Sequence, residues 1–269
     1  MNNSSDNKGK KILGYLFPGL ITLLVMLIVL VAKGIWPFGS SRIDLFDNMQ
    51  QVAPLYAHLW DAMHGDASIW FDWYTGLGTN VSMSMSAFSM ISPFNLFLYL
   101  CPRDYILEFI SVLTVIKTFV MSVTMYAFIN KRYNSLSYNI KALFAVAYAF
   151  CGYVLLYASC FTPWMDIVAL FPLLMMALDV MEKTGKKLFY IIMVAVMFII
   201  NYYLAAMSLV YILLVGGMYL IFMCDKKERC KKAWNVGIGT FTGIALSAFM
   251  LIPVFAQLSQ IGRASCRER

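Results

Sequence analysis

The sequence predicts an all-α polytopic membrane protein, and three observations lead to that fold class. Of the 269 residues, 61% are hydrophobic and only 13% are charged, which is too little charge to cover the surface of a soluble domain. The apolar residues recur in runs of about 18 or more, the length that an α-helix needs to cross a bilayer. The alternating pattern of about 10 residues that marks a membrane β-barrel strand does not occur in these runs.

We divide the chain into a cytoplasmic tail at residues 1–11, a transmembrane domain at 12–260 and a tail at 261–269 that we interpret as non-native. The transmembrane domain has about seven apolar runs, at approximately 12–32, 105–129, 141–159, 166–181, 188–203, 204–223 and 235–257. The first run resembles a signal peptide but lacks a small-residue cleavage site, so we interpret it as an uncleaved first helix.

Basic residues between the runs predict the orientation. They form four clusters: Lys8, Lys10 and Lys11; Lys131, Arg132 and Lys141; Lys183, Lys186 and Lys187; and Lys226, Lys227, Arg229, Lys231 and Lys232. With seven spans all four lie on one side, which the positive-inside rule makes cytoplasmic. The N-terminus is then cytoplasmic and the loop at 33–104 is extracytoplasmic. The net charge of +7 therefore indicates a lipid bilayer as partner and no nucleic acid.

The long first loop holds most of the polar residues. Residues 48–63 carry apolar side chains at helical spacing, which is typical of an amphipathic helix at the membrane interface: Met49, Val52, Leu55, Tyr56, Leu59 and Met63. Residues 91–102 (ISPFNLFLYLCP) are apolar but too short to span, which favours a re-entrant or interfacial segment. Six cysteines without a CxxC spacing indicate no metal or redox motif.

Two acids of this loop, Asp44 and Asp47, closely follow the first span. An outward carboxylate can act as a general base or hold a divalent cation against a phosphate. We expect three later polar residues on the same outer face: Asp166, Asn201 and Tyr202. The alternative is that each acid only solvates a loop or caps a helix, and we favour that role for the other loop acids: Asp61, Asp66 and Asp72.

Lys117 lies near the middle of the second span, too deep to reach water easily. A lysine at that depth is costly and usually faces a partner or a watery cavity. Two roles remain open for it. Lys117 could steady an anionic phosphate, or it could pair with a carboxylate elsewhere in the bundle.

The loop segments WPFGSSRIDLFDNMQQ, WFDWYTGLGTN and ISPFNLFLYLCP resemble the opening of the bacterial YfhO family of membrane proteins. CGYVLLYASCFTPWMDIVALFPLLMMALDVME and FIINYYLAAM continue the resemblance in the same order, over residues 12 to about 260. That family is similar to the C-type (GT-C) glycosyltransferases, which take sugars from a polyprenyl-phosphate carrier on the outer face. The resemblance implies a GT-C-like helical bundle in the bacterial cytoplasmic membrane. It also implies sugar transfer to an envelope polymer such as teichoic or lipoteichoic acid.

The resemblance also implies site residues. The family's Asp-x-x-Gln-Gln-like element falls on Asp47, Gln50 and Gln51, which makes Asp47 the implied catalytic acid. Asp44 is the near neighbour that could replace it. The tyrosine that often follows the glutamines is Val52 here, so one aromatic contact of the family is in doubt.

Later motifs complete the predicted site, and the family's Trp-x-Asp element matches Trp164 and Asp166. We assign the substrate contacts to Gln50, Gln51, Lys117, Trp164, Asp166, Asn201 and Tyr202. The sequence identifies no metal ligands, and the cofactor considered for this site is a divalent cation. It does not identify the sugar or the acceptor.

Members of the family are usually much longer, and this sequence ends in IGRASCRER. The reading ATC GGA AGA GCG TCG TGT AGG GAA AGA translates to these nine residues and resembles a common sequencing adapter. We therefore expect the native gene to continue, and this piece could be inactive alone. Two other functions stay open: a transporter or flippase for a lipid-linked sugar, and a non-enzymatic envelope membrane protein.

Overall fold

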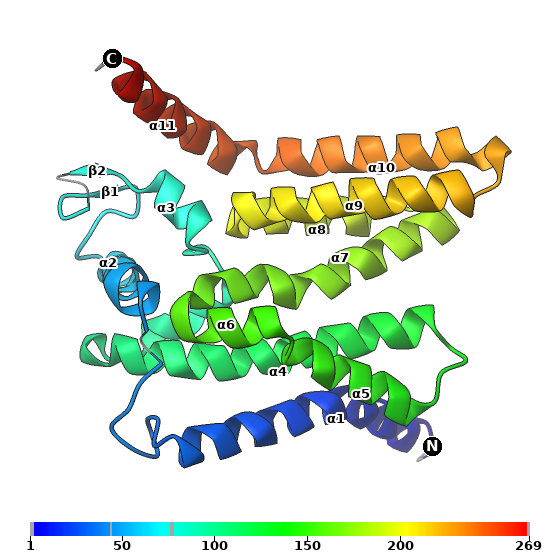
Figure 1. Ribbon diagram of the computed structural model, residues 1–269, viewed down its shortest axis with the longest axis horizontal. Helices are drawn as coiled ribbons and strands as arrows, with labels where there is room; N and C mark the ends of the chain where they lie inside the picture. The colour runs from blue at the N-terminus through cyan, green and yellow to red at the C-terminus, as the bar shows by residue number, and fades with distance from the viewer. Residues whose placement is uncertain (1–2, 44, 76–77, 268–269) are drawn as a thin grey trace. The chain divides into compact units, whose positions relative to one another are not determined.

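The computed structural model describes residues 3–43, 45–75 and 78–267, and most of them are helical (Figure 1). The strands β1 (Phe71–Asp72) and β2 (Thr79–Asn80) pair antiparallel as a small hairpin in the first loop. The predicted all-α polytopic class is confirmed.

The helices have the following bounds: α1 Asn3–Ala32, α2 Ala53–His64, α3 Ser82–Ala87, α4 Ile106–Arg132, α5 Tyr138–Ala149, α6 Gly152–Cys160, α7 Met165–Thr184, α8 Leu188–Ile200, α9 Tyr202–Phe222, α10 Lys226–Leu246 and α11 Ala248–Arg267. Four shorter helical turns connect them: the π-helix η1 Asn48–Val52 and the 3-10 helices η2 Pro93–Leu100, η3 Arg103–Tyr105 and η4 Thr162–Trp164. α1 begins at Asn3, so the polar N-terminal tail is continuous with the first span.

Five stretches of the described residues are long and apolar enough to cross a membrane: Ile12–Ala32, Arg103–Arg132, Tyr138–Cys160, Thr162–Thr184 and Tyr202–Phe222. A sixth candidate is α10 with the first part of α11, a pair bent by 75°. α8 is apolar but has 13 residues and a length of about 20 Å, which is shorter than a bilayer core. The count of about seven spans stays a prediction.

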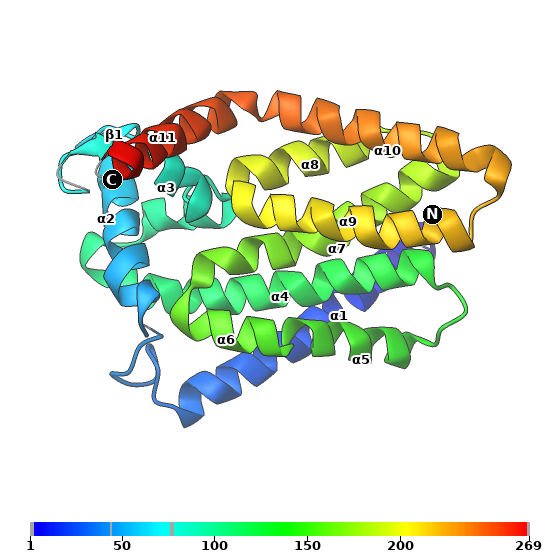
Figure 2. The ribbon, with the colours of Figure 1, turned by 45° about the horizontal axis from the view of Figure 1, so that its top comes forward.

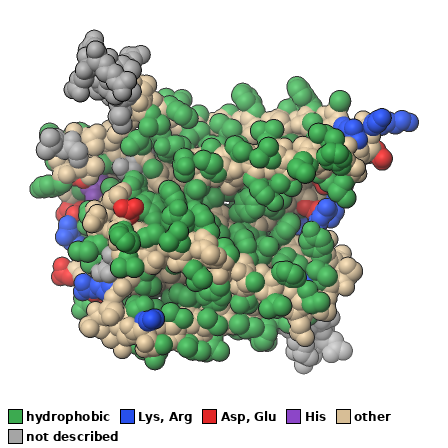
Figure 3. All heavy atoms as spheres, viewed as in Figure 1, with side chains coloured by type: hydrophobic (Ala, Val, Ile, Leu, Met, Phe, Trp, Pro, Cys, Tyr) green, Lys and Arg blue, Asp and Glu red, His purple; other side chains and the backbone are tan. Residues whose placement is uncertain are grey.

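Hydrophobic side chains cover the helices in the space-filling view, while charged side chains gather toward helix ends (Figure 3). Leu213 and Phe241 are each 75% exposed, and many other large apolar side chains are exposed too. A surface of this kind is stable in hydrocarbon and not in water. The molecule is therefore built for a lipid environment.

The chain divides into two compact units, and each is described by itself. Unit 1 comprises residues 1–54 and 96–176, and unit 2 comprises residues 55–95 and 177–269.

Unit 1 is built on α1, α4 and α5, which pack along one another (Figure 2). At Gly19 a Cβ would lie 2.7 Å from side-chain carbons of Phe119 and Val123, so glycine allows α1 to approach α4 closely. Asn130 then links all three helices, because it donates to Tyr15 Oη (2.8 Å) and accepts from Lys141 Nζ (2.9 Å).

Unit 2 is built on α8 and α10, with α3, α9 and α11 packed around them. A Cβ at Gly239 would lie 2.8 Å from the Tyr190 ring, so this glycine allows α10 to approach α8 closely. The Tyr190 and Thr240 hydroxyls add a hydrogen bond of 2.9 Å between the two helices. Gln257 of α11 fastens the first loop by accepting from Met83 N and donating to Asn80 O.

The amphipathic helix predicted over residues 48–63 is confirmed as η1 followed by α2. Four of the predicted apolar positions are buried: Val52, Leu55, Tyr56 and Leu59. Met49 is instead 58% exposed and Asn48 is fully buried. The helix begins with the π turn η1, whose wider winding changes which side chains face inward. Placement of this helix at the membrane interface stays a prediction.

Candidate functional site

Asp47 lies where the first loop turns from irregular chain into helix. The residue before it, Phe46, has φ +48°, a left-handed conformation that costs a bulky side chain about 1–3 kcal/mol. The residues after it form the π-helix η1, a feature that often marks functional sites. Strained backbone persists only where surrounding contacts enforce it. Here the Phe46 carbonyl accepts hydrogen bonds from Met49 N (3.2 Å) and Gln50 N (3.0 Å).

Asn48 fastens this part of the loop to the turn between α6 and α7. Its Nδ2 donates to the Ser159 carbonyl at 3.1 Å, and its Oδ1 accepts from the Thr162 amide at 2.9 Å. The side chain is fully buried, so the loss of either bond would leave a buried polar group without that partner. Asn48 thus holds the neighbouring Asp47 beside the α6–α7 turn.

The Asp47 side chain is half-buried, and Gln51 Nε2 donates to its Oδ1 at 2.7 Å. Gln50 and Gln51 are both exposed. An ionised carboxylate has about four acceptor sites, so one hydrogen bond orients Asp47 without exhausting its capacity to accept a proton. The structure therefore brings together the predicted acid and one of its two predicted glutamines.

The predicted residues Lys117 and Asp166 form a buried ion pair. Lys117 Nζ lies 2.6 Å from Asp166 Oδ1, and both side chains are 0% exposed. The same ammonium donates to the Thr162 carbonyl at 3.1 Å. Of the two roles that the sequence left open for Lys117, the structure shows the pairing with a carboxylate. A substrate contact for Lys117 or Asp166 stays a prediction.

The depth of this pair follows from its place in α4. Lys117 comes eleven residues after Ile106, which is about 17 Å along the helix axis. Thr162, whose carbonyl accepts the lysine's hydrogen bond, therefore lies beside the interior of α4 and is recessed from its start.

These contacts form a continuous path from the loop acid to the buried pair. We call it the loop–turn cluster, and its members are Asp47, Asn48, Gln51, Lys117, Thr162 and Asp166. Thr162 is the junction, because its amide binds Asn48 and its carbonyl binds Lys117. All six residues belong to unit 1.

Trp164, the predicted partner of Asp166 in the Trp-x-Asp element, belongs to an aromatic group at the same turn. Its ring centroid lies 4.8 Å from that of Tyr157 and 5.0 Å from that of Phe161. Trp164 is half-buried, so it packs against the turn and still presents part of its surface.

Asn201 and Tyr202 belong to unit 2, where they make structural contacts. Asn201 is fully buried and caps α9 by accepting from Leu204 N at 3.0 Å. Its amide donates to Ala87 O (2.8 Å), and Tyr202 N donates to Ser86 Oγ (3.2 Å). Both residues thus hold the α3 region, and their predicted place beside Asp47 stays a prediction.

Asp44 lies outside the described residues. Asp72, expected to be structural, accepts hydrogen bonds from Thr75 Oγ1 and Tyr74 N within its own turn and lies 3.7 Å from His58 Nδ1. Burial opposes the charged form of Asp72, but these hydrogen bonds and the nearby histidine outweigh it, so the pKa of the carboxyl is lowered.

Metal binding by the protein alone would need several ligands in one place. No group of three or more His, Cys, Asp or Glu side chains that could hold a metal occurs among the residues the structure describes. Magnesium is often held by one or two carboxylates together with substrate phosphates. Asp47 is the residue of the loop–turn cluster that could contribute in that way.

The structure adds two residues that the sequence did not single out, Asn48 and Thr162. Asn48 shares a helix face with the buried Val52 and Tyr56, so a polar residue on an apolar face was a signal available in the sequence. Thr162 acts through its backbone, and its side-chain type carries no corresponding signal.

A family model described as "Bacterial membrane protein YfhO" matches residues 19–267. The matched range includes every residue of the loop–turn cluster. No curated protein and no solved structure matches the chain significantly.

Proposed function

The chain belongs to the YfhO family of bacterial membrane proteins, and from that premise we propose that it is a membrane glycosyltransferase. It would transfer a sugar from a polyprenyl-phosphate carrier to a cell-envelope polymer, such as teichoic or lipoteichoic acid. The reaction would take place on the extracytoplasmic face of the bacterial cytoplasmic membrane, with the N-terminus in the cytoplasm.

One observation carries this proposal: a half-buried carboxylate at the membrane loop is oriented by Gln51 and anchored, through Asn48, on a recessed turn. A general base must be held within hydrogen-bond reach of the hydroxyl from which it takes a proton. Asp47 is held by neighbours on both sides, and it remains half-exposed for a substrate to reach.

In the proposed step the acceptor hydroxyl oxygen attacks the anomeric carbon of the sugar. The bond between that carbon and the phosphate oxygen breaks, and the carrier leaves as polyprenyl phosphate. Asp47 takes the hydroxyl proton, and Asp44 is the reserve candidate for the same role. Gln50 would donate hydrogen bonds to sugar or phosphate, which an exposed amide side chain can do.

Lys117 and Asp166 would act as positioning residues in this scheme. Their mutual pairing and the lysine's bond to Thr162 fix the turn to which Asn48 is fastened. The predicted contacts of Lys117 and Asp166 with the donor phosphate would require the pair to open. The predicted contacts of Trp164, Asn201 and Tyr202 remain part of the proposal.

The test is a deletion strain that expresses the complete gene product carrying Asp47→Asn, with the sugar content of the envelope polymer measured by mass spectrometry. We expect glycosylation to fall by about 10²-fold or more, because general-base catalysis contributes 10²–10⁴-fold. Asp66→Asn is the matched control, since Asp66 is an exposed acid of the same loop outside the cluster. Retained glycosylation in Asp47→Asn would rule out its catalytic role.

A transporter or flippase for a lipid-linked sugar is the second candidate. The 75° bend between α10 and α11 favours it, because transporters bind substrates at discontinuous helices. This function predicts that Asp47→Asn leaves movement of the lipid-linked sugar across the membrane unchanged. A purely structural envelope protein would show neither activity.

A further inference from the structure

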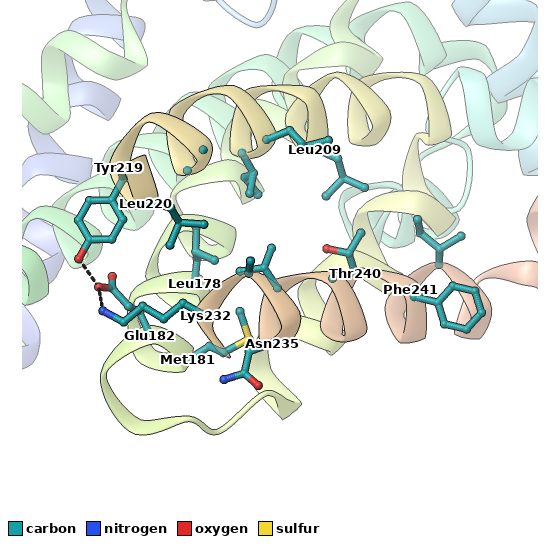
Figure 4. Close-up of a pocket in the computed structure, with 18 residues that line it drawn as sticks. Leu178, Met181, Glu182, Leu209, Tyr219, Leu220, Lys232, Asn235, Thr240 and Phe241 are labelled. Atoms are coloured by element: carbon teal, nitrogen blue, oxygen red, sulfur yellow. Dashed lines mark hydrogen bonds and ion pairs between the residues drawn. The ribbon is translucent and has the colours of Figure 1, made fainter. Parts of the chain in front are cut away.

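Unit 2 contains a cavity of about 520 Å³ between α7, α9 and α10 (Figure 4). Its wall is mostly apolar and includes Leu178 and Met181 of α7, Leu209 and Leu220 of α9, and Phe241 of α10. The volume lies in the range of about 300–1,000 Å³ that is typical of ligand sites.

Two glycines of the cavity wall have open space beside them. Gly217 of α9 and Gly237 of α10 line it, and a Cβ added at either one would meet no atom within 4 Å. Gly239 on the same helix differs, because a Cβ there would lie 2.8 Å from the Tyr190 ring. Close packing therefore explains Gly239 but does not explain Gly217 or Gly237. A glycine inside a helix costs about 1 kcal/mol relative to alanine, so these two positions lower the stability of their helices without a packing reason.

One end of the cavity is polar, as Figure 4 shows. The Tyr219 hydroxyl donates to the Glu182 carboxylate, and Lys232 Nζ lies 3.2 Å from the same carboxylate oxygen. The ammonium also lies 3.2 Å from Glu228 Oε2. The cavity thus combines a long apolar wall with one charged end, which is the pattern that an amphiphile requires.

The charge around that end favours an anion. The first two turns of α10 carry five basic residues: Lys226, Lys227, Arg229, Lys231 and Lys232. Arg229 caps the end of α9 by donating to the carbonyls of Ile221 (2.7 Å) and Cys224 (3.0 Å). Four lysines remain, against three carboxylates at this end: Asp225, Glu182 and Glu228. Basic clusters of this size at a membrane surface attract anionic lipids.

The apolar wall continues onto surface that is suited to hydrocarbon. Leu213 and Phe241 line the cavity, yet each is 75% exposed. Only 17% of the apolar stretch of α9 is buried. A chain from the surrounding bilayer could therefore enter the cavity from the side, without crossing water.

We propose that this cavity holds one acyl chain of an anionic phospholipid from the bilayer, with the lipid phosphate at Lys232. Glu182 and Tyr219 position the Lys232 ammonium at the mouth of the apolar wall, and the other lysines of α10 add positive potential. This proposal does not depend on the glycosyltransferase function.

The first test addresses the head group. The purified full chain is delipidated in detergent and titrated by native mass spectrometry with phosphatidylglycerol or with phosphatidylcholine of identical acyl chains. We expect phosphatidylglycerol to bind more tightly, and Lys232→Gln to weaken it about fivefold, the effect of one lysine at an anionic lipid. Lys231→Gln is the control, because Lys231 is exposed on the same helix turn and does not line the cavity. Its effect should be smaller.

The second test addresses the acyl chain. Gly217→Leu fills the cavity and should weaken both lipids about tenfold, which corresponds to about two methylene groups no longer buried. Gly152→Leu is the control, because Gly152 of α6 also has nothing within 4 Å of an added Cβ and lies outside the cavity. Size-exclusion chromatography shows whether each variant remains folded.

Several results would overturn the proposal. They are equal binding of the two lipids, equal effects of Lys231→Gln and Lys232→Gln, and equal effects of Gly152→Leu and Gly217→Leu. A second copy of the chain bound in place of lipid, and lost in Gly217→Leu, would also contradict it.

Discussion

Two lysine–carboxylate pairs in this molecule differ in burial, and that difference separates their roles. In the loop–turn cluster, Lys117 and Asp166 are both 0% exposed and 2.6 Å apart. In the α7–α9–α10 cavity, Lys232 and Glu182 are 23% and 25% exposed and 3.2 Å apart. A fully buried pair cannot lose one charge cheaply, whereas a partly hydrated pair can rearrange around a ligand. The first pair is suited to holding a turn, and the second to exchanging partners.

The largest stability effect should come from breaking the buried pair. Lys117→Met leaves the Asp166 charge buried without its cation, which should cost roughly 3–5 kcal/mol of unfolding free energy. We expect the protein still to insert into membranes and to lose activity. Denaturant unfolding in detergent measures the loss, and the double variant Lys117→Met/Asp166→Asn should recover much of it. If Lys117→Met were fully active, Lys117 would have no part in the site.

Asn48→Ala should give the next largest effect. The substitution removes the hydrogen bonds to the Ser159 carbonyl and the Thr162 backbone amide. The buried Thr162 N–H then loses its Asn48 acceptor, which costs about 1–3 kcal/mol of unfolding free energy. Because Asn48 also positions Asp47, sugar transfer should fall more than stability alone explains. Gln50→Ala is the comparison variant for the free energy of unfolding, because the Gln50 side chain is exposed. Equal unfolding free energies in the two variants would show that Asn48 does not fasten the loop.

Lys232→Gln should change stability much less than Lys117→Met. Its pair with Glu182 is partly hydrated, so the expected cost is below about 1 kcal/mol. The same unfolding measurement, made without added lipid, tests this expectation. A loss as large as that of Lys117→Met would contradict the contrast between the two pairs.

The smallest effect should be a pH dependence at Asp72. Its pKa in the folded chain is lowered from the ordinary value of 3.8, so its contribution to stability is present above about pH 3.8. That contribution is lost as the pH falls through the folded pKa. Unfolding of the wild type and of Asp72→Asn between pH 5 and 3 measures it, with Asp66→Asn as the control. If the unfolding free energies of the wild type and of Asp72→Asn changed in parallel with pH, Asp72 would make no pH-dependent contribution to stability.

The sequence predicted the helical class because long apolar runs satisfy their backbone hydrogen bonds internally in lipid. It did not predict the break between α5 and α6, since residues 141–159 are apolar on both sides of it. It also placed Lys117 correctly as a residue in need of a partner. It could not name Asp166 alone as that partner, because the pairing requires a turn that is recessed from the start of α4.

The candidate site was also predictable in part, where its contacts join residues that are close in the sequence. Asp47 and Gln51 are four residues apart on one helical segment, so local geometry brings them together. The anchor at Asn48 joins residues more than 100 positions apart, and no spacing rule encodes such a contact. Sequence reasoning therefore grouped Asp47 with Gln51, which lie in contact, and missed what holds the loop in place.

The most direct test of the central claim compares donor binding with sugar transfer in purified Asp47→Asn. If Asp47 is the general base, the affinity for a polyprenyl-phosphate sugar should stay near the wild-type value. The rate of transfer to an acceptor polymer in a single turnover should fall by about 10²-fold or more. An unchanged transfer rate, or a loss of donor binding that accounts for the whole defect, would contradict the assignment of Asp47 as the base.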